Sequence, residues 1–122
     1  MALNWFCGSY VHADAQALLE LPVDVVILSV SILSFKSVLD SLPLDLFRGK
    51  LVVDVLSVKT HPKESMLQLL HPECDILCTH PMFGPQSGKT SWVGLPLMYE
   101  KVTWPHVREK QRVAKNRGDR ER

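Results

Sequence analysis

The sequence predicts an α/β fold, an incomplete doubly wound parallel sheet with flanking helices. Short apolar runs rich in β-branched residues alternate along the chain with segments that have the apolar spacing of helices. Strands that alternate with helices form βαβ units, and the right-handed crossover of such a unit makes its strands parallel. The chain of 122 residues is 46% hydrophobic, which suits a single globular domain.

Three strands are expected, over residues 24–30, 51–57 and 75–79. The first follows from the run Val23–Val30, whose nearly continuous apolar residues are typical of a strand buried on both faces of a parallel sheet. Because each strand is joined to the next by a helix-like segment, we expect the three strands to be adjacent and parallel.

Two crossover helices are expected between these strands. Residues 34–42 have a natural N-cap in Ser34, and their apolar residues fall at positions i, i+3, i+4 and i+7. Residues 60–70 begin with Thr60 as the cap and have Pro62 in the first turn. Each segment therefore has one apolar face that can pack on the sheet.

The charge of the chain is concentrated at one end. Residues 101–122 hold eight Lys/Arg and three Asp/Glu, a net charge of +5. Since the whole chain carries +1, residues 1–100 carry −4. A basic run could contact nucleic acid or an acidic membrane surface, but without interleaved aromatic residues it favours a solvated, frayed end. We therefore expect no nucleic-acid partner.

The three cysteines are an odd set, which favours a reducing compartment over a disulfide framework. Together, His71, Cys74, Cys78 and His80 superficially suggest a zinc site. On a strand, Cys74 and Cys78 would lie about 13 Å apart, too far for two sulfurs that each approach one zinc ion to about 2.3 Å. We expect no metal, and cysteines that pack as small apolar side chains.

From the sequence we expect neither a secretory signal nor a membrane span. Its longest apolar runs fall far short of the roughly 20 residues that a transmembrane helix needs. We therefore expect a soluble protein with no membrane partner.

Polar side chains follow two of the expected strands. Residues 78–88, CTHPMFGPQSG, place His80 at the end of the third strand, before a turn-rich loop of small residues. The second strand ends near Ser57 and Lys59. Open α/β sheets bind ligands beyond the carboxyl ends of their strands, so we expect all three side chains at one crevice. Imidazole titrates near pH 6.5, so His80 can accept a hydroxyl proton at neutral pH.

Each of these residues also has a plain structural interpretation. Without its motif, a strand-end histidine is more often a surface or capping residue than a catalyst. Ser57 alone suits the start of a helix, and Lys59 is expected to be solvated. Asp54, inside an apolar strand, is expected to be a buried hydrogen-bond acceptor that holds adjacent loops. Trp92 could stack on a ligand, but isolated aromatic residues more often fill a core or an interface.

Four motifs make the chain similar to a known family. They are SILS at 31–34, DVLSVK at 54–59, DILCTHPMFGP at 75–85 and SWVGLPLMYEKV at 91–102. In this order and spacing they closely resemble the plant-type arogenate/prephenate dehydrogenases of tyrosine biosynthesis, over residues 22–102.

The resemblance implies an oxidoreductase that uses NADP, or alternatively NAD, for the oxidative decarboxylation of arogenate or prephenate. In the family, hydride leaves the ring carbon that bears the hydroxyl while a histidine takes the hydroxyl proton, and carbon dioxide departs as the ring becomes aromatic. Full-length members are expected to be homodimers, and plant members work in plastids. Residues 1–20 do not have the composition of a transit peptide, so a cytoplasmic location stays open.

The functional residues of the family can be carried onto matching positions of this chain. Its catalytic histidine falls on His80 and its active-site serine on Ser57. Its strand-end cofactor contacts fall on Ser29, Ser31 and Thr79. Its substrate-pocket segment, which usually carries glutamate where this chain has glutamine, falls on Gly84, Pro85, Gln86, Ser87 and Gly88.

The resemblance also divides the chain. Residues 1–21 are expected to be a poorly matched N-terminal segment with a short helix at 13–20, residues 22–102 a partial nucleotide-binding α/β domain, and residues 103–122 a basic, disordered tail. The 122 residues contain no Gly-x-Gly-x-x-Gly turn, which cradles the pyrophosphate in a complete Rossmann-like domain. We also expect the C-terminal helical domain of the family to be missing. The alternative to a dehydrogenase fragment is a non-catalytic remnant or interaction module that pairs with an intact subunit.

Overall fold

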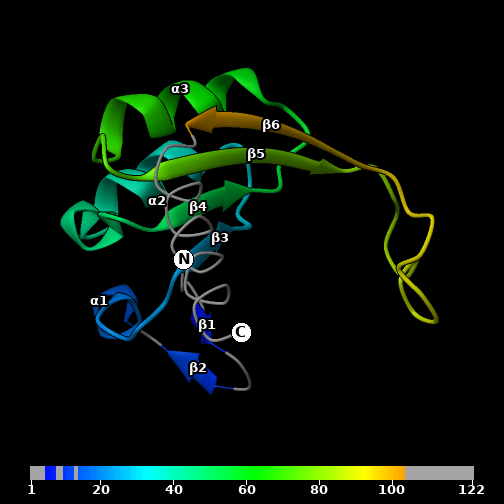
Figure 1. Ribbon diagram of the computed structural model, residues 1–122, viewed down its shortest axis with the longest axis horizontal. Coiled ribbons are helices and arrows are strands. Elements are labelled where there is room, and N and C mark those ends of the chain that lie inside the picture. Colours follow the sequence, from blue (N-terminus) through cyan, green and yellow to red (C-terminus); the bar gives the residue numbers. More distant parts are fainter. Residues whose placement is uncertain (1–4, 8–9, 13, 104–122) are drawn as a thin grey trace, which may run out of the picture.

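The computed structural model describes residues 5–7, 10–12 and 14–103 of the chain. Its main sheet has four strands in the order β3 (Val25–Leu28), β4 (Leu51–Asp54), β5 (Asp75–Pro81) and β6 (Leu97–Thr103) (Figure 1). A separate hairpin pairs β1 (Trp5–Cys7) with β2 (Tyr10–His12). The helices are α1 (Ala15–Leu19), α2 (Phe35–Ser41), the 3₁₀ helix η1 (Leu44–Phe47) and α3 (Thr60–Leu69). The expected basic tail lies outside the described residues, apart from its first position.

The predicted parallel core of the sheet is confirmed. The β3 and β4 strands pair in parallel with Val26 opposite Val52, and β4 pairs in parallel with β5 with Val52 opposite Ile76. Helix α2 lies between β3 and β4 along the chain, and α3 lies between β4 and β5. The fold is therefore a mostly parallel, Rossmann-like sheet with flanking helices.

Two pairings were not predicted from the sequence. The β6 strand pairs antiparallel with β5, with Thr79 opposite Tyr99, and this pairing extends β5 to Pro81. Most residues of β6 are exposed, so the strand has no apolar face to mark it in the sequence. The β1–β2 hairpin has a clearer signal, because Gly8-Ser9 stands between its strands and such a pair favours a two-residue turn.

The core lies on one face of the main sheet, beneath α2 and α3 (Figure 1). Alternate strand residues point into it, and these include Leu28, Val52, Ile76 and Cys78. The expectation that the first strand is buried on both faces is wrong. In β3, Val26 and Leu28 are buried whereas Val25 and Ile27 are 47% and 60% exposed. The reason is that β3 is an edge strand whose second face is not covered.

The helix starts differ in part from the sequence expectation. Ser34 is the N-cap of α2, but its hydroxyl donates back to the carbonyl oxygen of Ser31 at 3.2 Å rather than capping the helix. In α3, Thr60 is the first helical residue and the N-cap is Lys59, which makes no capping hydrogen bond with its side chain. The expected short helix at 13–20 is present as α1, where Asp14 accepts a hydrogen bond from the backbone N–H of Gln16 at 2.9 Å.

No helix within the described ranges is long and apolar enough to cross a membrane.

Candidate functional site

The carboxyl ends of the parallel strands bring the candidate residues to one edge of the sheet. Asp54, the last residue of β4, lies opposite Cys78 of β5. Ser57 follows β4 by three residues and His80 follows Cys78 by two, so both are placed beyond this pair. Ser29 and Ser31 follow the end of β3 at the same edge. The topology therefore gathers the residues that the sequence singled out.

The side chains of the predicted catalytic pair are not joined. His80 is half-buried, and Ser57 is exposed in the turn before α3. Within the described part of the chain, no hydrogen bond links the Ser57 hydroxyl to the imidazole of His80. Their catalytic roles stay predictions.

The three predicted cofactor contacts have different surroundings. Ser29 and Ser31 are exposed, and the Ser31 hydroxyl accepts a hydrogen bond from the backbone N–H of Leu33 at 3.3 Å. Thr79 is buried, and its hydroxyl donates to the carbonyl oxygen of Asp54 at 2.6 Å. Thr79 therefore helps to hold β5 against β4, whatever else it contacts.

Asp54 is confirmed as a buried acceptor. Lys59 was expected to be solvated, but it is paired with Asp54 instead. The Asp54 side chain is 0% exposed, and its Oδ1 accepts a hydrogen bond from the backbone N–H of Leu56 at 3.0 Å. The Lys59 ammonium donates to the same Oδ1 and to the carbonyl oxygen of Thr79. An unpaired carboxylate is costly to bury, so the ammonium of Lys59 packs against Asp54 instead of extending into solvent.

Cys74 and Cys78 are packed as expected. Cys78 is fully buried, and burial together with the nearby Asp54 carboxylate raises the pKa of its thiol to about 12. Burial also raises the pKa of the Cys74 thiol, which donates to the carbonyl oxygen of Phe47 at 3.1 Å. Among the described residues, no group of three or more His, Cys, Asp or Glu side chains is placed to hold a metal ion.

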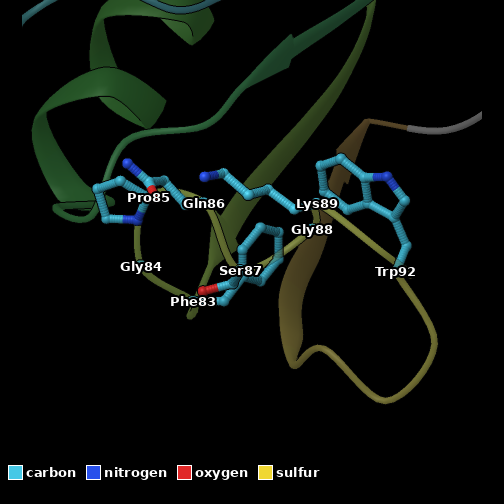
Figure 2. Close-up of a pocket in the computed structure, with 8 residues that line it drawn as sticks. All are labelled: Phe83, Gly84, Pro85, Gln86, Ser87, Gly88, Lys89 and Trp92. Carbon is cyan, nitrogen blue, oxygen red and sulfur yellow. The ribbon is translucent and has the colours of Figure 1, made fainter.

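A pocket of about 600 Å³ lies in the loop between β5 and β6 (Figure 2). Residues 83–89 and Trp92 line it, so all of the predicted substrate-pocket residues lie together. The loop extends well beyond the end of the sheet (Figure 1). His80 and Ser57 do not line the pocket. The structure therefore separates the strand ends that carry Ser57 and His80 from the loop pocket, whereas the sequence predicted one crevice.

The loop is held in shape by close backbone and ring contacts. Phe83 and Trp92 meet edge to face with ring centroids 5.5 Å apart, and Trp92 is 71% exposed rather than part of a core. Gln86 has a φ of 69°, in the left-handed region that few residues other than glycine adopt. Lys89 also lines the pocket, and the sequence analysis missed it because no motif singled it out.

Comparison with known proteins identifies the family. The model of the prephenate dehydrogenase nucleotide-binding domain matches residues 8–96. The chain belongs to this family. The match confirms the resemblance read from the motifs and agrees with the parallel sheet described above.

Two proteins from Arabidopsis thaliana are similar to this chain. One is named arogenate dehydrogenase 2, chloroplastic, and is 59% identical over 96 residues, which are 78% of this chain and 27% of that protein. The other is named arogenate dehydrogenase 1, chloroplastic, and is 52% identical over 96 residues, or 78% of this chain and 15% of that protein. The chain therefore spans less than a third of the length of these relatives.

Proposed function

We propose that this chain supplies part of an arogenate dehydrogenase, an oxidoreductase that uses NADP to decarboxylate arogenate in tyrosine biosynthesis. The observation that carries the proposal is the 59% identity over 96 residues to a protein named arogenate dehydrogenase 2. Prephenate is the alternative substrate and NAD the alternative cofactor. The word chloroplastic in the names of both relatives supports a plastid location. The full-length enzyme is proposed to be a homodimer.

In this proposal, His80 accepts the proton of the ring hydroxyl. As that proton leaves, the ring carbon gives up its hydride and becomes a carbonyl. Loss of carbon dioxide then makes the ring an aromatic phenolate, which takes the proton back from the His80 imidazolium. The nicotinamide, when bound, supplies the hydride acceptor. Ser57 is proposed to hydrogen-bond the imidazole or the substrate hydroxyl, since a serine hydroxyl can both donate and accept. Ser57 lies beyond the carboxyl end of β4, and His80 lies near the carboxyl end of the adjacent parallel strand β5. This placement supports these roles.

The residues present fit one end of a dinucleotide and not the other. Ser29 and Ser31 are exposed beyond β3, where their hydroxyls can contact the nicotinamide half. The sequence of 122 residues contains no Gly-x-Gly-x-x-Gly motif, which receives the pyrophosphate in a complete domain. Residues Gly84, Gln86, Ser87 and Gly88 are proposed to contact the substrate, because they line one pocket.

A hybrid enzyme tests this function. The stretch of arogenate dehydrogenase 2 that matches this chain would be replaced by the corresponding 96 residues of the chain. We expect the hybrid to reduce NADP when arogenate is added, and assays with prephenate and with NAD rank the alternatives. A folded hybrid that turns over neither substrate with either cofactor, beside an active parent enzyme, would rule the proposal out.

The exposed apolar side chains of β3 favour a second candidate function, an interaction module without activity of its own. Val25 and Ile27 are 47% and 60% exposed on the edge strand. A module of this type would bind an intact dehydrogenase subunit through that face. Binding of the chain to arogenate dehydrogenase 2, lost in a Val25→Lys/Ile27→Lys variant, would support this candidate.

A further inference from the structure

The ion pair between Asp54 and Lys59 connects the two strand ends that carry the candidate catalytic residues. Asp54 Oδ1 accepts from the backbone N–H of Leu56, the residue before Ser57. The Lys59 ammonium, bound to the same oxygen, also donates to the carbonyl oxygen of Thr79, the residue before His80. One carboxylate and one ammonium thus bind the backbone next to both residues.

The carboxylate of this pair is fully buried, and the ammonium is partly buried. Asp54 is 0% exposed, and the Lys59 side chain is 28% exposed. Asp54 Oδ2 has no hydrogen-bond partner among the described residues, so Oδ1 carries the contacts that hold the carboxylate in place. A fourth contact, from the Thr79 hydroxyl to the carbonyl oxygen of Asp54, closes the connection between β4 and β5.

A second ion pair nearby has the opposite character. Lys63 of α3 pairs with Glu100 of β6, and their side chains are 35% and 52% exposed. It joins the helix to the outer strand, and among the described residues neither side chain is hydrogen-bonded to the Ser57 turn or to the backbone beside His80. Exposed pairs of this type contribute little to structure, so Lys63 and Glu100 provide a matched control.

We infer that Asp54 and Lys59 are positioning residues that hold the Ser57 turn and the His80 strand end in register with each other. This inference rests on the proposed function, because it assigns the pair a role in placing that enzyme's catalytic groups. Neither residue needs to touch the substrate. A displacement of about 1 Å at a catalytic group can cost on the order of 10²-fold in rate, so a clamp on both backbones would matter for turnover.

The test uses a variant that removes the clamp without leaving a lone buried charge. Removing one partner alone would strand the other and threaten folding, whereas Asp54→Asn/Lys59→Met neutralises both. In the hybrid enzyme we expect this variant to lower kcat at least about 10-fold while KM changes less than about twofold. The control variant Lys63→Met/Glu100→Gln should have the kcat of the unmodified hybrid. The single variant Lys59→Arg keeps a cation beside Asp54, so its kcat should lie above that of the double variant.

Nuclear magnetic resonance on the 122-residue chain gives a readout that does not depend on activity. The Asp54→Asn/Lys59→Met variant should shift the His80 imidazole and Ser57 amide resonances, and the control variant should not. Unchanged resonances, or a normal kcat beside an impaired His80→Asn hybrid, would overturn the inference. Shifted resonances beside a fully active His80→Asn hybrid would instead overturn the proposed function and leave the clamp as a structural feature.

Discussion

Gly88 lies so close to the ring of Trp92 that a Cβ atom at position 88 would be 3.0 Å from Cε2 of the indole. Real side chains avoid contacts of this length, so the glycine permits the ring to close over the loop. The same ring meets Phe83 edge to face and forms one wall of the pocket. The shape of the pocket therefore depends on a residue without a side chain.

Gly88→Ala should displace Trp92 and open this wall. Overpacking typically costs about 1–3 kcal/mol, and we expect the low end because the exposed indole can move. Gly84→Ala is the matched control, because a Cβ there meets its nearest atom, the Ser87 hydroxyl oxygen, at 3.9 Å. The Trp92 indole resonance should shift in the first variant and stay in place in the second. Equal spectra for the two variants would show that Gly88 is not needed for the contact.

The parallel core of the fold could be predicted because its signals are local. The run Val23–Val30 and the apolar spacing of residues 34–42 reflect side chains that pack into the core. Such a pattern can be seen in the sequence itself. The β6 strand could not be predicted in this way, since most of its residues are exposed and its pairing is set by β5. Only one face of β3 is buried, because burial depends on which elements cover the sheet. An apolar run in the sequence does not show this.

The candidate site was predicted in position but not in its contacts. Ser57 lies three residues after β4, and His80 is the penultimate residue of β5 rather than a residue beyond that strand. The two residues are still at the same end of the sheet, because parallel topology fixes which strand ends meet. Lys59 was misread as solvated, since a lysine in a turn is usually exposed and its pairing with Asp54 depends on a fold around a buried carboxylate. The separation of the loop pocket from the strand edge follows from the long extension of the loop, which no residue pattern reveals (Figure 1).

The helical layer should carry much of the stability of the domain. Leu39 of α2 is 0% exposed, whereas Leu33, just before that helix, is 94% exposed. We expect Leu39→Ala to lower the free energy of unfolding by about 2–5 kcal/mol, because it removes buried apolar contacts and leaves a cavity. Leu33→Ala should change it by less than about 0.5 kcal/mol. Urea unfolding of the two variants decides this, and a similar loss in both would contradict the packing described here.

Stability should also fall at alkaline pH because of Cys78. The pKa of its thiol is about 12 in the folded chain against an ordinary value of 9.0. The thiol ionises more readily in the unfolded chain, so its contribution is complete below about pH 9 and is lost as pH rises toward 12. Urea unfolding at pH 8 and 10.5 should show this decline, and Cys78→Ala should reduce it. An equal decline in that variant would assign the effect to other groups.

The chain by itself should bind NADP weakly or not at all. The helix N-terminus that receives a pyrophosphate is preceded by a glycine turn, and the sequence of 122 residues contains no Gly-x-Gly-x-x-Gly motif to form one. Isothermal titration calorimetry should give no micromolar binding for this chain, with full-length arogenate dehydrogenase 2 as the positive control. Micromolar affinity would mean that the strand-end hydroxyls of Ser29 and Ser31, or other residues, hold the dinucleotide without that turn.

Catalysis by the hybrid enzyme should depend strongly on His80 and less on Ser57. General-base assistance is typically worth about 10²–10⁴-fold, so His80→Asn should lower kcat by that order while KM changes less. Ser57→Ala removes one neutral hydrogen bond, worth roughly 0.5–1.5 kcal/mol, and should cost about 10-fold or less. Steady-state kinetics of both variants checks this ranking. An unimpaired His80→Asn hybrid would exclude the proposed base and make His80 a structural residue at the end of β5.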